Sequence, residues 1–333
     1  VSLTGLPKGA FGVFTSGGTA ANLSAMVTAR EYWRENDIYK GEKGLIITSI
    51  GAHSSIKAMA KVIDVDVLLV DTEDKLLGSE LKKTIEGLTE HQRTRLFAVV
   101  ATGGTTNAGI IDDLEGIANI CETENLWFHV DAAYGGGALV ANSVRHLFNG
   151  IEKADSITID PHKWMFSPYD CGAVIYKKPE LAKKAHSQEG SYLDIFKDEG
   201  AHGFNPSEYQ IQLTRRVRGL PLWFSLAMHG TNRYKQAVER GLELAQIAGK
   251  LINENPHVEL VRAPSLSCVL YRRIGWKPED YTHWTYENHK KGFALVTPTK
   301  WKQGNSFETV SRFCFINPDT TKKDIQMILN SMK

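Results

Sequence analysis

Long apolar runs are missing from this sequence of 333 residues. The longest runs, such as residues 65–70, have the length of a β-strand and fall far short of the roughly 20 residues that a membrane-spanning helix needs. A strong charge of one sign is missing too, because the formal net charge is only +1. The composition therefore indicates neither a membrane nor a nucleic acid as a partner.

Cysteine is scarce, and its four positions lie far apart in the sequence: Cys121, Cys171, Cys268 and Cys314. This spacing predicts neither a disulfide framework nor a zinc or other metal site, and it favours reduced thiols in a cytoplasmic enzyme. An initiating methionine and a signal sequence are absent as well, so we expect the chain to begin within a longer protein.

Short apolar runs alternate with helical patterns over the first two thirds of the chain. Strands are predicted for residues 11–14, 45–50, 65–70, 96–101, 127–131, 156–159 and 173–176. Between strands, apolar residues recur three and four positions apart, as at Leu81, Ile85 and Leu88, which is typical of helices. This order predicts an α/β fold with a mostly parallel sheet flanked by helices.

The pattern changes after residue 221. Helices are predicted for residues 222–255, 278–291 and from Thr321 onward, and strands for residues 258–261, 267–272, 293–296 and 311–316. We therefore predict a large domain over residues 1–221 and a small α+β domain over residues 222–333. A ligand of the large domain is expected at the carboxyl ends of its strands.

The most informative segment is SITIDPHKW, residues 156–164, in which Lys163 follows an apolar strand between His162 and Trp164. A lysine amine must lose its proton to form an imine, which partial burial and a neighbouring cation favour. The alternative is a surface lysine at a strand–loop junction. That alternative leaves the apolar approach and the two flanking rings without a purpose.

Asp131 ends another apolar strand, WFHVD, and the small residues Ala132 and Ala133 follow it. A carboxylate buried there needs hydrogen bonds or a cationic partner, and a protonated pyridine nitrogen is one such partner. The small side chains leave room for a flat ring. Alternatively, Asp131 only caps the next turn.

Two polar segments follow other strands. The segment SGGT, residues 16–19, places Gly18 and Thr19 at a helix start that suits an anion, although it also fits a simple helix cap. The segment AHSS contains His53, which is either a ring that stacks on a flat ligand or a solvated loop histidine.

Two more segments remain open to two interpretations each. Thr106 ends the small, hydroxyl-rich run ATGGTT, which suits either a ligand contact or an ordinary glycine turn. Residues 190–206 are long and polar and contain Tyr192, so they form either a loop that closes over a substrate or a plain surface connection.

Taken in order, these segments resemble the group II decarboxylases that depend on pyridoxal 5'-phosphate (PLP), the family of aromatic-amino-acid, histidine and glutamate decarboxylases. The resemblance covers nearly the whole chain through GGT (17–19), AHSS (52–55), GTT (104–106), HVDAAY (129–134), PHKW (161–164), YL (192–193) and RRVR (215–218). It implies the aspartate-aminotransferase-like fold, fold type I of PLP enzymes. It also implies a homodimer whose active sites lie at the subunit interface.

The resemblance also implies roles for individual residues. Lys163 would hold PLP as a Schiff base, and Asp131 would pair with its pyridine nitrogen. His53 would stack on one face of the ring, and Ala133 would pack on the other. The implied phosphate ligands are Gly18, Thr19 and His162, with the Thr106 hydroxyl near the cofactor. Tyr192 matches the loop tyrosine that returns a proton to the substrate in the neighbouring subunit's site.

The implied reaction converts an L-amino acid into an amine and CO₂, with an aromatic amino acid favoured. In related plant enzymes a phenylalanine at the position of Tyr192 accompanies aldehyde formation, so the tyrosine favours plain decarboxylation. One alternative is an aminotransferase or a lyase on the same scaffold, which His53 and Tyr192 disfavour. Another is a truncated, inactive subunit that still binds PLP.

The sequence departs from the family in two respects. It contains no match to the N-terminal helical segment that wraps the partner subunit, and Asp160 stands near the phosphate where members often carry asparagine. Two anions repel each other unless one is paired or protonated. Arg215, Arg216 and Arg218 could select a second substrate carboxylate, but we expect them to form structural pairs near the domain junction.

Overall fold

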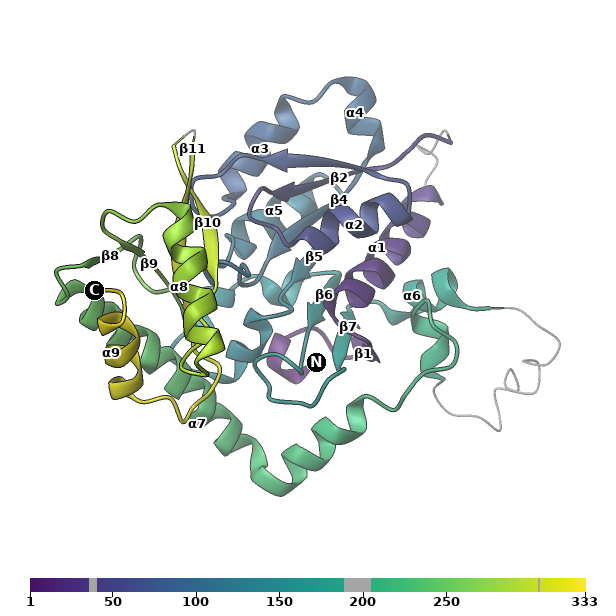
Figure 1. Ribbon diagram of the computed structural model, residues 1–333. Helices are drawn as coiled ribbons and strands as arrows, with labels where there is room; N and C mark the ends of the chain where they lie inside the picture. The colour runs from purple at the N-terminus through teal and green to yellow at the C-terminus, as the bar shows by residue number, and fades with distance from the viewer. Residues whose placement is uncertain (36–40, 189–204, 305) are drawn as a thin grey trace.

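The structure is a computed structural model that describes residues 1–35, 41–188, 205–304 and 306–333. Its larger sheet has seven strands in the order β1-β7-β6-β5-β4-β2-β3 (Figure 1). The bounds are β1 Phe11–Thr15, β2 Leu45–Ser49, β3 Asp66–Val70, β4 Leu96–Thr102, β5 Trp127–Asp131, β6 Ser156–Ile159 and β7 Gly172–Tyr176. The seven strands predicted for this part of the chain are therefore confirmed.

The sheet is mostly parallel, as predicted. The strands β6, β5, β4, β2 and β3 run in one direction, whereas β7 runs antiparallel to both of its neighbours, β6 and β1. No α-helix lies between β6 and β7 to carry the chain back across the sheet, so it reverses direction there. As a result, the carboxyl ends of β1, β2, β4, β5 and β6 lie along the same edge of the sheet.

Helices cover both faces of this sheet. One face packs against α1 (Gly18–Arg34), α2 (Ser54–Val62) and α6 (Pro179–His186), and the other against α3 (Gly78–Glu86), α5 (Leu114–Thr123) and the second half of α7 (Gly219–Asn253). The short helix α4 (Glu90–Arg95) leads into β4. Along β4, Ala98 and Val100 contact the first group, while Val99 and Ala101 contact the second. Because both faces are covered, the strands read as continuous apolar runs.

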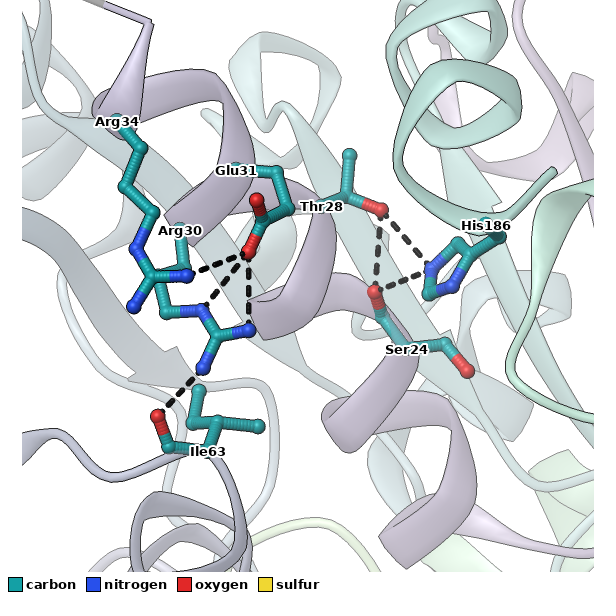
Figure 2. A network of polar contacts seen from close by, with 7 residues as sticks. All are labelled: Ser24, Thr28, Arg30, Glu31, Arg34, Ile63 and His186. Atoms are coloured by element: carbon teal, nitrogen blue, oxygen red, sulfur yellow. Dashed lines mark hydrogen bonds and ion pairs between the residues drawn. The ribbon is translucent and has the colours of Figure 1, made fainter. Parts of the chain in front are cut away.

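Polar contacts hold α1 against its neighbours (Figure 2). The Nε2 atom of His186, at the end of α6, lies 3.2 Å from the Thr28 hydroxyl and 3.0 Å from the Ser24 carbonyl oxygen. On the other side of α1, Arg30 donates a hydrogen bond of 2.6 Å to the carbonyl oxygen of Ile63 just after α2. These contacts fix the axis of α1 and thereby the position of its first turn.

The C-terminal part contains a second, antiparallel sheet in the order β10-β11-β9-β8. Its elements are β8 Val258–Leu260, β9 Cys268–Arg273, α8 Pro278–Lys290, β10 Pro298–Gln303, β11 Ser306–Cys314 and α9 Lys322–Asn330. The strand predicted for residues 293–296 is wrong, because β10 begins only at Pro298. The apolar run there instead places Val296 in the core beside α8, where its carbonyl accepts a hydrogen bond from Thr285.

The long helix predicted for residues 222–255 is present as α7, but it contains a break. Gly230 has φ 72° and ψ 159°, a conformation that glycine tolerates and that bends the helix, as Figure 1 shows. The domain boundary predicted at residue 221 falls within the first turn of α7, and the division itself stays a prediction. None of the helices in the described ranges has the length and apolar character that a membrane crossing requires.

Candidate active site

A cavity of about 400 Å³ opens where the carboxyl ends of the strands converge, a size typical of ligand sites. Eight of the predicted site residues line it: Gly18, Thr19, His53, Thr106, Asp131, Ala133, His162 and Lys163. Tyr192 and most of its loop lie outside the described residues. The fold thus brings into one space residues that lie far apart in the sequence.

The start of α1 forms one wall of the cavity. No side chain caps this helix, which leaves its first N–H groups for an anion. A side chain on Gly18 would lie 3.0 Å from Asp160 Oδ2 and 3.1 Å from Ala133 Cβ, and one on Gly17 would lie 3.3 Å from the His162 ring. Gly17 also has φ +147°, a backbone conformation that other residues rarely adopt. Backbone conformation and limited space therefore both favour glycine at position 17.

Asp131 is held by hydrogen bonds at the end of β5 and is only 6% exposed. Its Oδ1 accepts from the Ala133 N–H at 3.1 Å, and its Oδ2 accepts from the Asn22 amide at 2.9 Å. The same amide lies 3.1 Å from Ser55 Oγ, which is 2.9 Å from His53 Nδ1. A continuous chain of hydrogen bonds therefore connects the carboxylate to the imidazole of His53.

His129 lies behind this chain and orients it. The ring is fully buried, with Nε2 3.0 Å from Asn22 Oδ1 and Nδ1 2.8 Å from Ser156 Oγ. Burial lowers the pKa of His129 to about 4, although the charge of Asp131 opposes the shift. A neutral ring that donates to the Asn22 oxygen turns the NH₂ group of Asn22 toward Asp131.

Sequence reasoning missed this supporting network: Asn22, Ser55, His129 and Ser156. The only signal for Asn22 was its polarity among the apolar positions of a helix, and in the structure it is 1% exposed. His129 occupies the middle of an apolar strand, where a histidine is usually a satisfied core residue. Only the packing of α1 on β5 and β6 shows that the two side chains meet.

Lys163 follows β6 and makes a short ion pair. Its Nζ lies 3.0 Å from Asp160 Oδ2, and His162 Nε2 lies 3.6 Å from the same oxygen. Asp160 is 2% exposed, and its Oδ1 has no hydrogen-bond partner among the residues described. The negative charge of Asp160 is therefore paired with the Lys163 ammonium, and the His162 ring lies beside the pair.

Packing fixes the residues on either side of Lys163. His162 Nδ1 accepts a hydrogen bond of 2.9 Å from the Cys171 N–H, and burial lowers the pKa of His162. Trp164 is fully buried, and its ring stacks on that of Tyr134 with centroids 5.1 Å apart and planes 8° apart. Lys163 itself lines the cavity, with a side chain that is 36% exposed.

The three arginines form structural contacts, as expected. Arg218 and Arg216 lie 3.2 Å and 3.8 Å from the carboxylate of Asp170, and Arg215 donates to the Leu213 carbonyl at 2.9 Å. In the described part of the chain, no arginine lines the cavity.

Comparison with known proteins identifies similar chains. The profile of the pyridoxal-dependent decarboxylase conserved domain matches residues 2–274. Aromatic-L-amino-acid decarboxylase from Bacillus atrophaeus is 32% identical over 100% of this chain and 70% of its own length. Acidic amino acid decarboxylase GADL1 from Xenopus tropicalis is 28% identical over 97% of this chain and 67% of its own length. The crystal structure of mouse CSAD matches with a TM-score of 0.86 and 25% identity, covering 99% of this chain and 72% of that one.

These matches confirm the predicted resemblance and the predicted fold class. The chain spans 47% to 70% of the length of the curated relatives. The cofactor of this family is PLP, and the groups around the cavity fit it. The uncapped helix start suits a phosphate, the Asp131 carboxylate suits a pyridine nitrogen, and the Lys163 amine suits an aldehyde. The buried hydroxyl of Thr102, which lacks a partner among the described residues, adds a further free polar group.

The buried His129 makes stability depend on pH. Its pKa is about 4 in the folded chain and about 6.5 when unfolded, so the unfolded chain binds the extra proton. The contribution of His129 to the free energy of unfolding is fully present above pH 6.5. It is lost as the pH falls toward 4, by a total on the order of 3 kcal/mol. Urea unfolding at pH 7.5, 6 and 5 measures this loss.

The variant His129→Gln isolates the contribution of this ring, because other buried histidines titrate in wild type and variant alike. We expect its stability to decline less steeply with acid than that of the wild type. His91→Gln, at an exposed position, serves as the control and should follow the wild-type slope. Equal slopes for His129→Gln and wild type would contradict a neutral buried imidazole.

Proposed function

Because the chain belongs to the pyridoxal-dependent decarboxylase family, we propose that it converts an L-amino acid into the corresponding amine and CO₂. One observation carries this proposal: Lys163, Asp131 and the uncapped start of α1 border the same cavity. These are an amine, a carboxylate and an anion site in one space.

The central roles fall to Lys163 and Asp131. PLP, when bound, accepts the electron pair that remains at the substrate's α-carbon as CO₂ departs. Lys163 would hold the cofactor through its side-chain amine. Asp131, held by Asn22 and by the Ala133 N–H, keeps the pyridine nitrogen protonated.

The remaining residues position the ring and its phosphate. His53, oriented by its hydrogen bond to Ser55, would stack on one face of the ring, and Ala133 would pack on the other. Gly18, Thr19 and His162 would bind the phosphate, and Thr106 would contribute a hydroxyl, since all four residues line the cavity. Tyr192 returns the proton to the α-carbon.

We favour an aromatic substrate. A second carboxylate on an acidic amino acid needs a basic side chain. No arginine of the described residues lines the cavity, and Arg215, Arg216 and Arg218 are already engaged with Asp170 and with a backbone carbonyl. The Bacillus relative that aligns with the entire chain is an aromatic-L-amino-acid decarboxylase, whereas the Xenopus relative acts on acidic amino acids.

We place the enzyme in the cytoplasm. All four cysteines are free thiols in the structure, the state that a reducing compartment maintains.

We also infer a homodimer, formed through an apolar surface on the first half of α7. This surface, the α7 stripe, consists of Val217, just before the helix, and of Leu220, Trp223, Phe224 and Met228 on it, and these residues are between 46% and 77% exposed. Leu220, Phe224 and Met228 recur at helical spacing and so share one side of the helix. An exposed apolar stripe of this kind suits an interface between two identical copies.

Replacing Lys163 by alanine tests the proposed activity. Wild type is incubated with PLP and an aromatic amino acid, an acidic amino acid or 2,4-diaminobutyrate, and CO₂ and amine are quantified. We expect turnover with the aromatic substrate to exceed the others and to fall by about 100-fold or more in Lys163→Ala, the range for loss of a positioned catalytic group. The visible absorbance of lysine-attached PLP should also disappear.

Lys82→Ala is the matched control, because this lysine is exposed on α3 and distant from the cavity. It should retain both absorbance and turnover. Formation of a keto acid in place of CO₂ would indicate an aminotransferase. Lysine-attached PLP in Lys163→Ala would show that another residue holds the cofactor.

Substituting Tyr192 by phenylalanine removes the hydroxyl that we assign to proton return. The amine yield should fall and the aldehyde yield should rise, because the variant lacks the hydroxyl that would return a proton to the α-carbon. Tyr286→Phe, at an exposed position of α8, is the control. An unchanged ratio of amine to aldehyde would remove Tyr192 from the mechanism.

A double substitution, Phe224→Glu with Met228→Glu, tests the α7 stripe. Burying two carboxylates at an apolar interface should weaken dimerisation roughly 30-fold or more, as measured by sedimentation over a range of concentrations. Val62→Glu, at a residue 71% exposed on α2, should leave the dimer intact. A wild-type chain that sediments as a monomer throughout would refute the proposed dimer.

A further inference from the structure

Two cysteines that the cavity does not use face each other in the small sheet. Cys268 on β9 and Cys314 on β11 are directly opposed in the antiparallel register, and their sulfur atoms lie 3.8 Å apart. They are separated by 45 intervening residues in the sequence, so only the pairing of β9 with β11 brings them together.

The backbone around this pair has the geometry that a disulfide needs. The N–H and carbonyl of Cys268 both bond to Ser265, while the Phe315 N–H donates to the Ser267 carbonyl at 2.9 Å. Cys268 and Cys314 are therefore a non-hydrogen-bonded pair, the type whose α-carbons approach to about 4.5 Å. That separation falls within the range that disulfides span.

The two thiols differ in a way that suits sequential oxidation. Donation from the Cys268 thiol and the charge of Arg312 lower the pKa of Cys314 to about 6, although burial opposes the shift. The pKa of Cys268 is raised instead. Cys314 is also partly exposed, whereas Cys268 is 2% exposed, so a small oxidant reaches the more nucleophilic sulfur first.

We propose that Cys268 and Cys314 form a modification site, a thiol pair that a peroxide oxidises to a cross-strand disulfide. The Cys314 thiolate attacks one peroxide oxygen, an S–O bond forms, the O–O bond breaks, and the released oxygen leaves as water after taking up a proton. The Cys268 sulfur then attacks the Cys314 sulfur, an S–S bond forms, and the hydroxide that leaves takes the Cys268 proton as a second water. Two thiols and one peroxide thus give one disulfide and two waters, and a thiol reductant reverses the change.

The cysteine pair lies next to a residue that lines the cavity. Cys268 Sγ lies 3.6 Å from the hydroxyl of Tyr134, which also bonds to Ser267. Tyr134 lines the cavity and stacks on Trp164, the residue after Lys163.

A metal role for the two cysteines is not supported, because the described residues contain no cluster of three or more metal-binding side chains. The oxidation itself does not depend on the proposed function.

The experiment treats the reduced chain of 333 residues with increasing hydrogen peroxide, blocks free thiols and digests with trypsin without reduction. Mass spectrometry should find residues 263–272 joined to residues 313–322, the tryptic peptides that hold Cys268 and Cys314. Free thiols should fall from four to two and return with dithiothreitol. Half-oxidation of Cys314 should require about tenfold less peroxide than that of Cys121, because thiolate reacts and thiol does not.

Two variants and a control identify the sulfurs. Cys314→Ser should abolish the cross-link, and Cys268→Ser should leave Cys314 as a sulfenic acid that dimedone labels. Cys121→Ser, at a residue 2% exposed in α5, should cross-link like the wild type. The proposal is overturned if wild type labels with dimedone without cross-linking, or if Cys121 or Cys171 oxidises at equal or lower peroxide.

Discussion

The hydrogen bond from Asn22 to Asp131 is the contact on which the arrangement of the site depends. It joins α1 to the end of β5 and fixes the uncapped helix start relative to the Asp131 carboxylate, both of which border the cavity. Asn22 is oriented in turn by the neutral, buried His129, so a core histidine sets the direction of a cavity group. A satisfied buried network of this kind is rigid, because each member would be costly to leave unpaired.

Charge balance is the second constraint. Asp160 is buried and lines the cavity, with Lys163 Nζ 3.0 Å and His162 Nε2 3.6 Å from its Oδ2. A buried carboxylate needs a cationic partner, and Lys163 supplies it. The small sheet contacts the cavity-lining residue Tyr134, whose hydroxyl meets Ser267 and Cys268. The larger sheet therefore supplies the strand ends that form the cavity, and the small sheet contributes contacts to one of its lining residues.

Prediction from sequence was clearest for the central strands of the larger sheet and failed at an edge strand of the small one. The strands β2, β4, β5 and β6 are buried along their whole length, so each is a distinct apolar run that can be found without a structure. β10 is an edge strand with the sequence PTKWKQ, and its polar residues do not signal a strand, whereas the nearby apolar run FALV packs Val296 without forming one. The antiparallel direction of β7 could likewise not be predicted from the sequence. It depends on how the connection from β6, which contains no α-helix, turns back beside that strand.

By itself, the sequence determined the family, the α/β class and the cavity residues that stand in short motifs, because strand ends, glycines and a lysine after an apolar run leave local signals. Only the tertiary structure decided which side chains support them: Asn22, Ser55, His129 and Ser156 acquire a role through contacts between elements far apart in the chain. The same holds for Cys268 and Cys314, which read as scattered thiols until the register of β9 and β11 places them opposite each other. Local motifs are encoded by neighbours in sequence, whereas hydrogen-bond partners and facing sulfurs are encoded by packing.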